Sequence, residues 1–572
     1  MKKPVIEFQN FSFQYHSQAE PTLKNINLTI HEGEKVLICG PSGSGKSTIG
    51  HCINGLVPYS YKGDISGTLK IMGKDAERLN LFDRAKMVGT VLQDTDGQFI
   101  SLTVGEDIAF ALENDCVPQD EMKQIVKEVS SLVAMEHYLQ QSVHHLSGGQ
   151  MQRVAIAGVL VNDVDILLFD EPLASLDPAT GEHVVQLIAE LQKKMNKTVV
   201  IIEHRLEDVL SYPVDRIIVL DDGEVVADME PDELLATDIL ERVHIREPLY
   251  LKAAKYANCK IQREMRPAHI DTFQVEACKE PLISWFHHAE LPPPPREDEP
   301  ILELDNISFY YEPNKFSLKN ISLSFKKGEM VSIVGQNGAG KSTLSKLMCG
   351  FERPQSGKIF YGGNDVTGDS IAERSLRVGM VLQNPNHMLS KHTIFEEVAF
   401  GLELRGVPEK ERMERVHDTL RICGLYPYRN WPISALSFGQ KKRVAIAAIL
   451  VLEPEVIILD EPTAGQDLLH YTEIMEFLLS LNQRGKTIIM VTHDMHLMLE
   501  YTPRAIVIDH GQVLADDSAI NILSDPDIVQ KANLKETSLF TLAERLGIEE
   551  KREFVARFIA FDKEEKKKWL HY

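Results

Sequence analysis

The chain has 572 residues, of which 43% are hydrophobic and 25% are charged, a balance that excludes wholesale disorder and leaves enough chain for several cores. Its 61 Lys and Arg against 84 Asp and Glu give a formal net charge of −23, which argues against broad, sequence-independent nucleic-acid binding. The seven cysteines are scattered and form no CxxC pair, which argues against a disulfide framework and against a structural zinc site.

The chain repeats itself once along its length. The pattern LKNINL…GPSGSGKST of residues 5–60 returns as LKNISL…GQNGAGKST in residues 301–350. Lys46 and Lys341 lie 295 residues apart, and later landmarks keep an offset of 289 or 290. A period of domain size is far too long for a solenoid, so the sequence predicts a tandem duplication.

Short apolar runs alternate with longer helical patterns in each copy. Nearly every residue of these runs is apolar, as expected for strands that are buried on both faces of a parallel sheet. Asp222 and Gly223, between residues 216–221 and 224–227, predict a hairpin turn. Helices between parallel strands indicate an α/β fold in each half. The runs are residues 36–39, 166–169 and 199–202 in the first copy and 331–334, 456–459 and 488–491 in the second.

A glycine-rich loop that fits GxxxxGK[ST] follows the first strand and opens a helix in each copy. The glycines let backbone N–H groups converge on phosphate oxygens, and the helix N-terminus adds the positive end of its dipole. We therefore predict two nucleotide sites, with Lys46 and Lys341 on the β and γ oxygens and with Ser47 and Ser342 on Mg²⁺. The loops comprise Gly40, Pro41, Ser42, Gly43, Ser44, Gly45, Lys46, Ser47 and Thr48, and Gly335, Gln336, Asn337, Gly338, Ala339, Gly340, Lys341, Ser342 and Thr343.

Two adjacent acidic residues end a later apolar strand in each copy. Asp170 and Asp460 stand at the carboxyl end of their strands, the edge of an open α/β sheet where ligands bind, and they are predicted to hold Mg²⁺ directly or through water. The next residues, Glu171 and Glu461, are placed to polarise an attacking water.

A histidine follows the next buried strand in each copy. His204 and His493 lie 34 and 33 residues beyond the aspartates, each at a strand end. A neutral imidazole at that place could hydrogen-bond the γ-phosphate and sense its loss, so both histidines are predicted to be functional.

The segment between the copies and the end of the chain fall outside the repeat. Residues 236–300 end in a proline-rich stretch that suits a semi-rigid spacer. The tail beyond residue 540 alternates apolar and charged residues at helical spacing and ends in a basic run that includes Lys566. That run predicts a solvated surface helix, with contact to membrane headgroups as the alternative.

Beyond the nucleotide loops, the chain resembles the ABC ATPase family through a Leu-Ser-Gly-Gly-Gln motif at residues 146–150 and its counterpart at 436–440. Each motif lies 23 residues before the strand-end aspartate and begins a predicted helix, over 151–161 or 441–451. Residues 175–177 and 465–467 also match. In the family this motif reaches across to nucleotide held by the partner domain. The resemblance also implies a metal and nucleotide role for Gln93 and Gln383, and stacking of adenine on Tyr15 and Tyr311.

The resemblance implies a head-to-tail pairing of the two halves with two composite ATP sites. One site would join Lys46, Asp170, Glu171 and His204 to Ser437, Gly439 and Gln440; the other would join Lys341, Asp460, Glu461 and His493 to Ser147, Gly148, Gly149 and Gln150. Phe438 stands where the family usually has glycine, and a bulky side chain limits close backbone approach to the phosphate. Our hypothesis is that both sites hydrolyse ATP and that the site next to Phe438 is slower.

Within the family, the chain is most similar to the ATPases of energy-coupling-factor importers. Residues 91–99, VLQDTDGQF, resemble the QNPDxQF stretch of that group, and the chain resembles overall the fused tandem ATPases of hydroxymethylpyrimidine or thiamine uptake. Two alternatives stay open: the tandem ATPase of a sugar importer, whose phosphate loops often degenerate in one half, and a soluble ribosome-associated ABC factor, which typically has a charged helical linker and basic surface. Both nucleotide loops are intact here, and the linker is acidic.

We therefore expect two tandem P-loop NTPase domains, each with a mainly parallel sheet core, an antiparallel β subdomain and a helical subdomain. The expected segments are the two ATP-binding domains at 4–235 and 301–540, the linker at 236–300 and a helical tail at 541–572. The resemblance implies ATP and Mg²⁺ as ligands, a transmembrane coupling subunit and a small substrate-binding membrane subunit as partners, and no nucleic acid. The first ten residues lack a signal-peptide core, and no stretch approaches 18 uncharged apolar residues. We expect a peripheral protein at the cytoplasmic face of the cell membrane.

Overall fold

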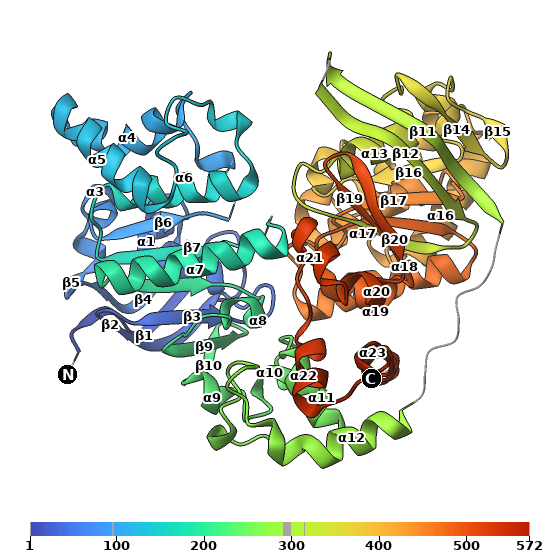
Figure 1. The fold of residues 1–572 in the computed structure, drawn as a ribbon. Helices are drawn as coiled ribbons and strands as arrows, with labels where there is room; N and C mark the ends of the chain where they lie inside the picture. Colours follow the sequence, from blue (N-terminus) through green and yellow to red (C-terminus); the bar gives the residue numbers. More distant parts are fainter. Residues whose placement is uncertain (1, 94–95, 175, 290–298, 314, 571–572) are drawn as a thin grey trace. The chain divides into compact units, whose positions relative to one another are not determined.

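The computed structural model describes residues 2–93, 96–174, 176–289, 299–313 and 315–570. The chain forms two compact units (Figure 1). The first comprises residues 1–287 and 541–548, and the second comprises residues 288–540 and 549–572. Each unit contains one six-stranded and one four-stranded sheet, which confirms the predicted duplication. Across the described residues, every helix is too short or too polar to span a bilayer.

The first unit is built on a six-stranded sheet in the order β10-β9-β3-β8-β7-β6. Five strands run parallel and β10 runs antiparallel at one edge, which confirms the expected α/β core. The strands β3, β7 and β8 coincide with the three predicted apolar runs, and their residues are almost completely buried. The strands are β3 (Lys35–Cys39), β6 (Val88–Val91), β7 (Ile166–Asp170), β8 (Thr198–Ile202), β9 (Arg216–Asp221) and β10 (Glu224–Met229).

A four-stranded antiparallel sheet in the order β2-β1-β4-β5 completes this unit. Its inner face shares one apolar core with the parallel sheet, in which Phe8 and Leu28 pack in the same cluster as Val36 and Ile38. Burial of such side chains contributes about 1.5–3 kcal/mol each, so this cluster holds the nucleotide loop on a rigid base. The strands are β1 (Pro4–Tyr15), β2 (Leu23–His31), β4 (Gly63–Ile71) and β5 (Lys74–Asp75).

The helices of the first unit cover the parallel sheet and form the expected helical subdomain, in which α4, α5 and α6 pack together. The signature motif begins α6, three residues earlier than predicted. The helices are α1 (Lys46–Asn54), α2 (Leu56–Tyr59), α3 (Leu81–Ala85), α4 (Val104–Asn114), α5 (Gln119–Leu132), α6 (Gly148–Leu160), α7 (Pro178–Met195), α8 (Leu206–Val209), α9 (Pro231–Leu234), α10 (Ile239–Arg242), α11 (Leu249–Tyr256) and α12 (Lys279–His288).

The second unit repeats this architecture. Its sheets have the orders β16-β17-β18-β13-β19-β20 and β12-β11-β14-β15. The strands are β11 (Pro300–Glu312), β12 (Lys315–Lys326), β13 (Met330–Val334), β14 (Ser356–Tyr361), β15 (Asn364–Asp365), β16 (Val378–Val381), β17 (Val456–Asp460), β18 (Thr487–Val491), β19 (Arg504–Asp509) and β20 (Gln512–Asp517). The helices are α13 (Lys341–Met348), α14 (Ile371–Arg374), α15 (Ile394–Leu404), α16 (Glu409–Ile422), α17 (Phe438–Leu450), α18 (Leu468–Gln483), α19 (Met495–Tyr501), α20 (Ala519–Leu523), α21 (Pro526–Lys531) and α23 (Lys551–Leu570), and α22 (Ser538–Leu546) lies mostly in the first unit.

The predicted hairpin turn is confirmed. The strands β9 and β10 pair antiparallel across Asp222 and Gly223, whose φ angles are +44° and +80°. Two successive residues with positive φ are typical of the tight turn that matches the twist of the paired strands, and the sequence Asp-Gly favours that turn.

The segment expected to be a linker is largely folded. Residues 239–288 contain α10, α11 and α12, and the Tyr250 hydroxyl donates to the Pro267 carbonyl at 2.7 Å inside this region. Residues 541–548, most of α22, belong to the same compact unit, where the Arg545 guanidinium donates to the carbonyls of Ile270 and Phe273. The proline-rich stretch lies almost entirely outside the described residues, and the boundaries expected at 235, 300 and 540 stay predictions.

The predicted tail helix is present as α23, but the expected exposure of its basic end is wrong for Lys566. This side chain is only 5% exposed, and its ammonium lies 2.8 Å from carboxylates of both Asp562 and Glu500. Phe554 and Phe558 on the same helix are fully buried. Buried charges are stable only when paired, so Lys566 fastens the tail to α19 and reaches neither solvent nor lipid.

Lys35 at the start of β3 allows the free-energy cost of a buried lysine to be tested. Its side chain is 2% exposed, and its ammonium has no hydrogen-bond partner among the described residues. Burial lowers the pKa of Lys35 to about 8, so the unfolded chain binds more protons than the folded chain between pH 8 and 10.5. Met330 occupies the matching place on β13 in the second unit.

We expect Lys35→Met to stabilise the protein by roughly 1–3 kcal/mol at pH 7 and by much less near pH 10.5. Charging Lys35 in the folded state opposes folding below pH 8, and this cost fades as the pH rises toward the ordinary lysine pKa. Thermal melts of both proteins across pH 7–10.5 measure the difference. A stability gain that is the same at every pH would contradict the explanation.

Candidate functional site

The glycine-rich loop of each unit lies between a central strand and the helix that follows it. The Lys46 ammonium is held by the Gly40 and Pro41 carbonyls, both at 2.8 Å, and the side chain is 8% exposed. Lys341 makes the same two bonds in the second unit, to Gly335 at 2.7 Å and Gln336 at 2.9 Å. Each lysine is therefore anchored at the loop that would surround the phosphates.

Gly45 shows why this loop needs glycine. It is the N-cap of α1 with φ +97°, and a Cβ there would lie 2.7 Å from the Leu23 side chain. Any other residue would be strained in conformation and would also clash, so the backbone N–H groups at the start of α1 stay accessible only with glycine.

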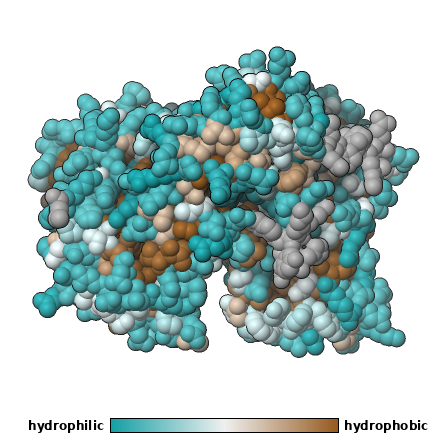
Figure 2. All heavy atoms as spheres, turned by 90° about the horizontal axis from the view of Figure 1, so that it is seen from below, coloured by the Kyte–Doolittle hydropathy of each residue, from teal (hydrophilic) through white to brown (hydrophobic). Residues whose placement is uncertain are grey.

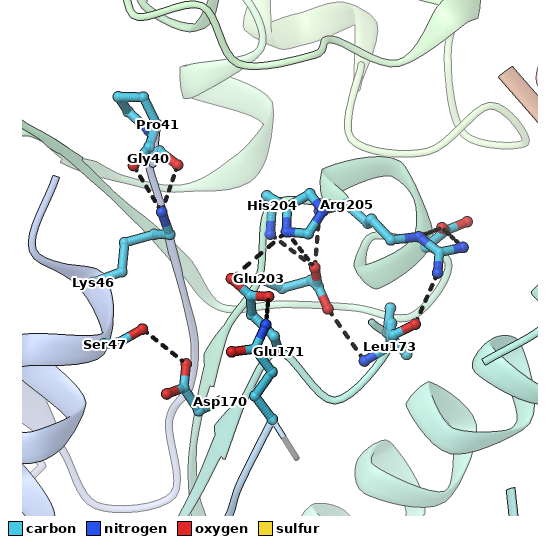
Figure 3. A network of polar contacts seen from close by, with 12 residues as sticks. Gly40, Pro41, Lys46, Ser47, Asp170, Glu171, Leu173, Glu203, His204 and Arg205 are labelled. Atoms are coloured by element: carbon cyan, nitrogen blue, oxygen red, sulfur yellow. Dashed lines mark hydrogen bonds and ion pairs between the residues drawn. The ribbon is translucent and has the colours of Figure 1, made fainter. Parts of the chain in front are cut away.

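Ser47 and Asp170 come together at the edge of the sheet, as predicted (Figure 3). The Ser47 hydroxyl donates to Asp170 Oδ1 at 3.4 Å, and burial raises the pKa of Asp170 to about 6. A hydroxyl and a carboxylate are hard oxygen ligands, and Mg²⁺ usually takes one or two such protein ligands together with phosphate oxygens and waters. The pair fits Mg²⁺, whose charge would favour the ionised form of Asp170.

Glu171 and Glu461 share an unusual backbone conformation. Their φ angles are +47° and +46°, although glutamate rarely adopts positive φ. Each backbone N–H donates to the end of the neighbouring strand, at Ile202 in the first unit and Val491 in the second. Strain of this kind persists only when the surroundings enforce it, and here both units enforce it at the same position.

In the first unit Glu171 lies within a cluster of polar side chains (Figure 3). Its carboxylate accepts a hydrogen bond from the Gln93 amide at 2.5 Å and lies 3.9 Å from His204 Nδ1. Burial, and next the charge of Glu203, raise the pKa of Glu171 to about 8. A carboxylate with a raised pKa is suited to accept a proton from water near neutral pH. Gln93, Glu171 and His204 therefore lie together in the described structure of the first unit.

The second unit pairs the equivalent groups more tightly. Glu461 Oε1 lies 3.1 Å from His493 Nδ1, and the Thr492 hydroxyl donates to Glu461 Oε2 at 3.4 Å. Burial, and next the charge of Asp460, raise the pKa of Glu461 to about 8. Gln383 is exposed at the edge of this unit, and burial also raises the pKa of Asp460.

The signature residues form the N-termini of α6 and α17. Ser147 caps α6 through a reciprocal capping box with Gln150, and Ser437 does the same for α17 with Gln440. Gly149 packs against Thr180 of α7, which a Cβ would approach to 2.4 Å. Both helix ends thus present backbone N–H groups beside Ser147, Gly148 or Ser437, the arrangement that binds anions.

Phe438 is 41% exposed at the start of α17, and the Lys442 ammonium lies 5.4 Å from the centre of its ring. A large apolar side chain therefore projects beside the N–H groups of one signature only. Gly439, the next residue, is buried, and a Cβ there would lie 3.4 Å from the Gln466 side chain and 3.5 Å from the His470 side chain.

The two tyrosines expected to stack on adenine differ in their surroundings. The Tyr15 hydroxyl is hydrogen-bonded to the Thr48 hydroxyl at 3.0 Å, and its ring packs edge-on against Phe13. Tyr311 is 53% exposed, with the Lys346 ammonium 5.9 Å from its ring. Stacking on either ring stays a prediction.

Some residues around the glutamates were not singled out by the sequence analysis. Glu203 and Lys442 are both buried and contact the Glu171 and Glu461 segments of their respective units. Aligning the two copies gives the signal that finds them, because Glu203 is aligned with Thr492 and Lys442 is aligned with Gln152.

Comparison with known protein families places both halves in one group. A family model described as "ABC transporter" matches residues 23–174 and 318–464, and a model described as "ATP-binding cassette cobalt transporter" matches residues 237–309. Three bacterial proteins named "Putative ABC transporter ATP-binding protein" are similar over nearly the whole chain. They come from Clostridium perfringens (56% identical, covering 98% of this chain and 99% of that protein), Enterococcus faecalis (56%, 99% and 99%) and Photobacterium profundum (54%, 98% and 100%).

Two solved structures are also similar to part of the chain. The structure of cbiO1 from Clostridium perfringens, described as part of the ABC transporter complex cbiONQ, is 35% identical, covers 41% of this chain and 95% of its own, and has a TM-score of 0.38. An ATP-binding cassette of an ABC transporter in its ADP conformation is 27% identical, covers 41% and 98%, and has a TM-score of 0.37.

Proposed function

Since this chain belongs to the ABC transporter family, whose ATP-binding proteins hydrolyse ATP to drive transport, we propose that it powers an importer of the energy-coupling-factor type. The proposed cargo is a vitamin, a vitamin precursor such as hydroxymethylpyrimidine or thiamine, or a transition-metal ion. The proposed location is the cytoplasmic face of the cell membrane, where the chain would bind peripherally to a coupling subunit and a small substrate-binding subunit.

The observation that carries the importer type is the match of residues 237–309 to the cobalt-transporter model. This region contains α11 and α12 and separates the two ATPase domains. The stretch VLQDTDGQF at residues 91–99 independently resembles the energy-coupling-factor group. Both nucleotide loops keep their lysine and serine, which favours this group over the tandem sugar ATPases.

The two units are proposed to pair head to tail. Figure 3 shows the phosphate loop, Ser47, Asp170, Glu171 and His204 of the first unit close together, while the signature serines Ser147 and Ser437 are the N-caps of α6 and α17. A second anion-binding helix N-terminus needs a phosphate to bind, and the nucleotide of the other unit would supply it. Ser437 would then complete the site of Lys46, and Ser147 would complete the site of Lys341.

The residues of the first site have different roles in ATP binding and hydrolysis, and the equivalent residues have the same roles in the second site. Lys46 would bind the β and γ oxygens, and Ser47 and Asp170 would hold Mg²⁺, which would neutralise charge on the phosphates. Glu171 accepts a proton from the attacking water, and His204 hydrogen-bonds the γ-phosphate. ATP would be held by contacts to both units at once, so its hydrolysis would let them separate. That motion drives transport only through contacts to the membrane partner that differ between the closed and open states.

The surface after Gln93 is proposed to bind the coupling subunit. Ile100 and Leu102 follow this residue and are 67% and 76% exposed. Hydrophilic residues cover most of the surface in Figure 2, with apolar residues gathered in smaller patches. An exposed pair of large aliphatic side chains in the loop that begins at Gln93 suits contact with an apolar helix of a membrane protein.

We expect Leu102→His to weaken capture of the membrane partner at least about fivefold, because one buried leucine contributes about 1.5–3 kcal/mol. Histidine is the natural residue at the matching position 392. ATP hydrolysis by the isolated chain should not change. Val226→His is the matched control, since Val226 is 43% exposed on β10 outside this surface. Equal capture by both variants would exclude Leu102 from the interface.

The decisive test of the function is purification of the chain from its own cells with the membrane partners attached. A small substrate-binding membrane subunit in the complex, released together with a larger coupling subunit by detergent exchange, supports the importer. Copurification with a sugar-type permease pair would replace the importer class, and ribosomes in the purified material would overturn the importer altogether.

A further inference from the structure

The two units hold their histidine and glutamate by different means. The residue before the histidine is Glu203 in the first unit and Thr492 in the second. Glu203 is 0% exposed, and a carboxylate without solvent is costly unless each oxygen is satisfied. A buried charge at this position therefore requires specific partners, and the structure supplies them.

Glu203 connects the loop after β8 to the loop after β7 (Figure 3). Its Oε1 accepts from the backbone N–H groups of His204 at 2.9 Å and Arg205 at 3.2 Å, and it also lies 3.2 Å from His204 Nδ1. Its Oε2 accepts from the Leu173 N–H at 3.3 Å. Arg205 adds a bond from its guanidinium to the Leu173 carbonyl at 3.0 Å.

The second unit holds the matching segment through a lysine on α17. Lys442 of α17 is 3% exposed, and its ammonium donates to the carbonyls of Glu461 at 2.9 Å and Pro462 at 2.7 Å. Gln152 stands at the matching place on α6. The first unit thus has the buried carboxylate of Glu203 and no lysine at the position of Lys442, whereas the second unit has Lys442 and no glutamate at the position of Glu203.

The two units differ in which carboxylate lies nearest to the imidazole. His204 Nδ1 is nearer to Glu203 (3.2 Å) than to Glu171 (3.9 Å), whereas His493 Nδ1 lies 3.1 Å from Glu461 itself. At 3.2 Å from Glu203 Oε1, Nδ1 of His204 is the ring nitrogen placed to donate to that carboxylate, which leaves Nε2 for another partner.

We propose that Glu203 is a positioning residue of the first nucleotide site. It holds His204 with Nε2 available to the γ-phosphate. Because the imidazole then interacts with Glu203 and not with Glu171, the Glu171 carboxylate can bind water beside Gln93. In other catalytic sites, a carboxylate that binds one ring nitrogen of a histidine fixes the ring orientation and leaves the other nitrogen to act on the substrate. The proposal rests on the proposed ATP hydrolysis.

The test uses full-length protein in a Glu461→Gln background, so that hydrolysis is read at the first site. We expect Glu203→Gln to lower kcat about tenfold with the KM for ATP within about twofold, since it removes an interaction that acts through a positioned group. In a His204→Ala background the same substitution should cost nothing further, because residues that act as one unit are not additive. Losses that multiply would assign Glu203 a separate structural role and overturn the proposal.

Two further measurements keep the outcome clear. Glu247→Gln is the matched control, because Glu247 is a buried carboxylate in the same unit, 7% exposed and paired with Lys255, and hydrolysis should not change. The ¹⁵N shift of His204, assigned with the His204→Ala variant, reports protonation at Nδ1 and should change in Glu203→Gln even without turnover. An unchanged shift overturns the proposal, whereas a parent protein that does not hydrolyse ATP overturns only the proposed function.

Discussion

Replacing Glu171 and Glu461 together by glutamine is expected to lower steady-state ATP hydrolysis by more than about 100-fold, the usual contribution of a general base, while ATP binding is retained. Glu461 is buried and Glu171 is half-buried, and desolvation raises the pKa of each to about 8. Glutamine keeps the size but cannot accept the proton. Phosphate release and binding of a fluorescent ATP analogue measure the two properties separately.

The single variants rank the two sites. The site of Glu171 is proposed to be completed by the signature that contains Phe438, which is 41% exposed and limits close approach to the γ-phosphate. We therefore expect Glu461→Gln to cost more hydrolysis than Glu171→Gln, and Phe438→Gly to raise the activity that remains in Glu461→Gln. A larger loss from Glu171→Gln would reverse the ranking.

The head-to-tail pairing predicts an ATP-dependent cross-link between the two halves of one chain. Ser42 in the first phosphate loop and Ser437 in the second signature are both exposed in their own units. Changed to cysteine in the double-glutamine protein, they should be joined by a short bismaleimide when Mg-ATP is bound, and far less with ADP. Of the native cysteines only Cys116 is exposed, so it is replaced by serine.

The control pair for this cross-link lies within one half, at Ser42 and Ser147. It should stay unlinked with ATP, since the proposal assigns Ser147 to the nucleotide of Lys341. Efficient linking of Ser42 to Ser147 would show that each site is complete in its own half. A product of twice the chain mass would show that pairing occurs between two chains.

The sequence predicted those site residues that lie in short contiguous patterns at the ends of strands. The loop around Lys46, the pair Asp170 and Glu171, and His204 each follow a buried strand, and parallel strands bring their carboxyl ends to one edge. No sequence pattern predicts the positive φ of Glu171 and Glu461, because glutamate has no intrinsic preference for that conformation.

The remaining differences depend on contacts between distant residues. The sequence predicts that Lys566 begins a solvated basic run, because its partner Glu500 lies 66 positions earlier in the chain. Glu203 is next to a predicted histidine, yet its role depends on Leu173, 30 residues upstream. The helix start at Gly148 was placed three residues late, although Ser147 and Gln150 have the spacing of a capping box.

The assignment of residues 541–548 to the first unit has a consequence for biosynthesis. Leu542, Ala543 and Leu546 are buried there, and Arg545 caps two carbonyls of the segment that follows the first ATPase domain. The ribosome makes these residues after residues 288–540 of the second unit, so the first unit is completed only once that segment has been translated. A product that ends before residue 541 would therefore leave the Ile270 and Phe273 carbonyls without Arg545, a difference by which cellular proteases could distinguish such fragments.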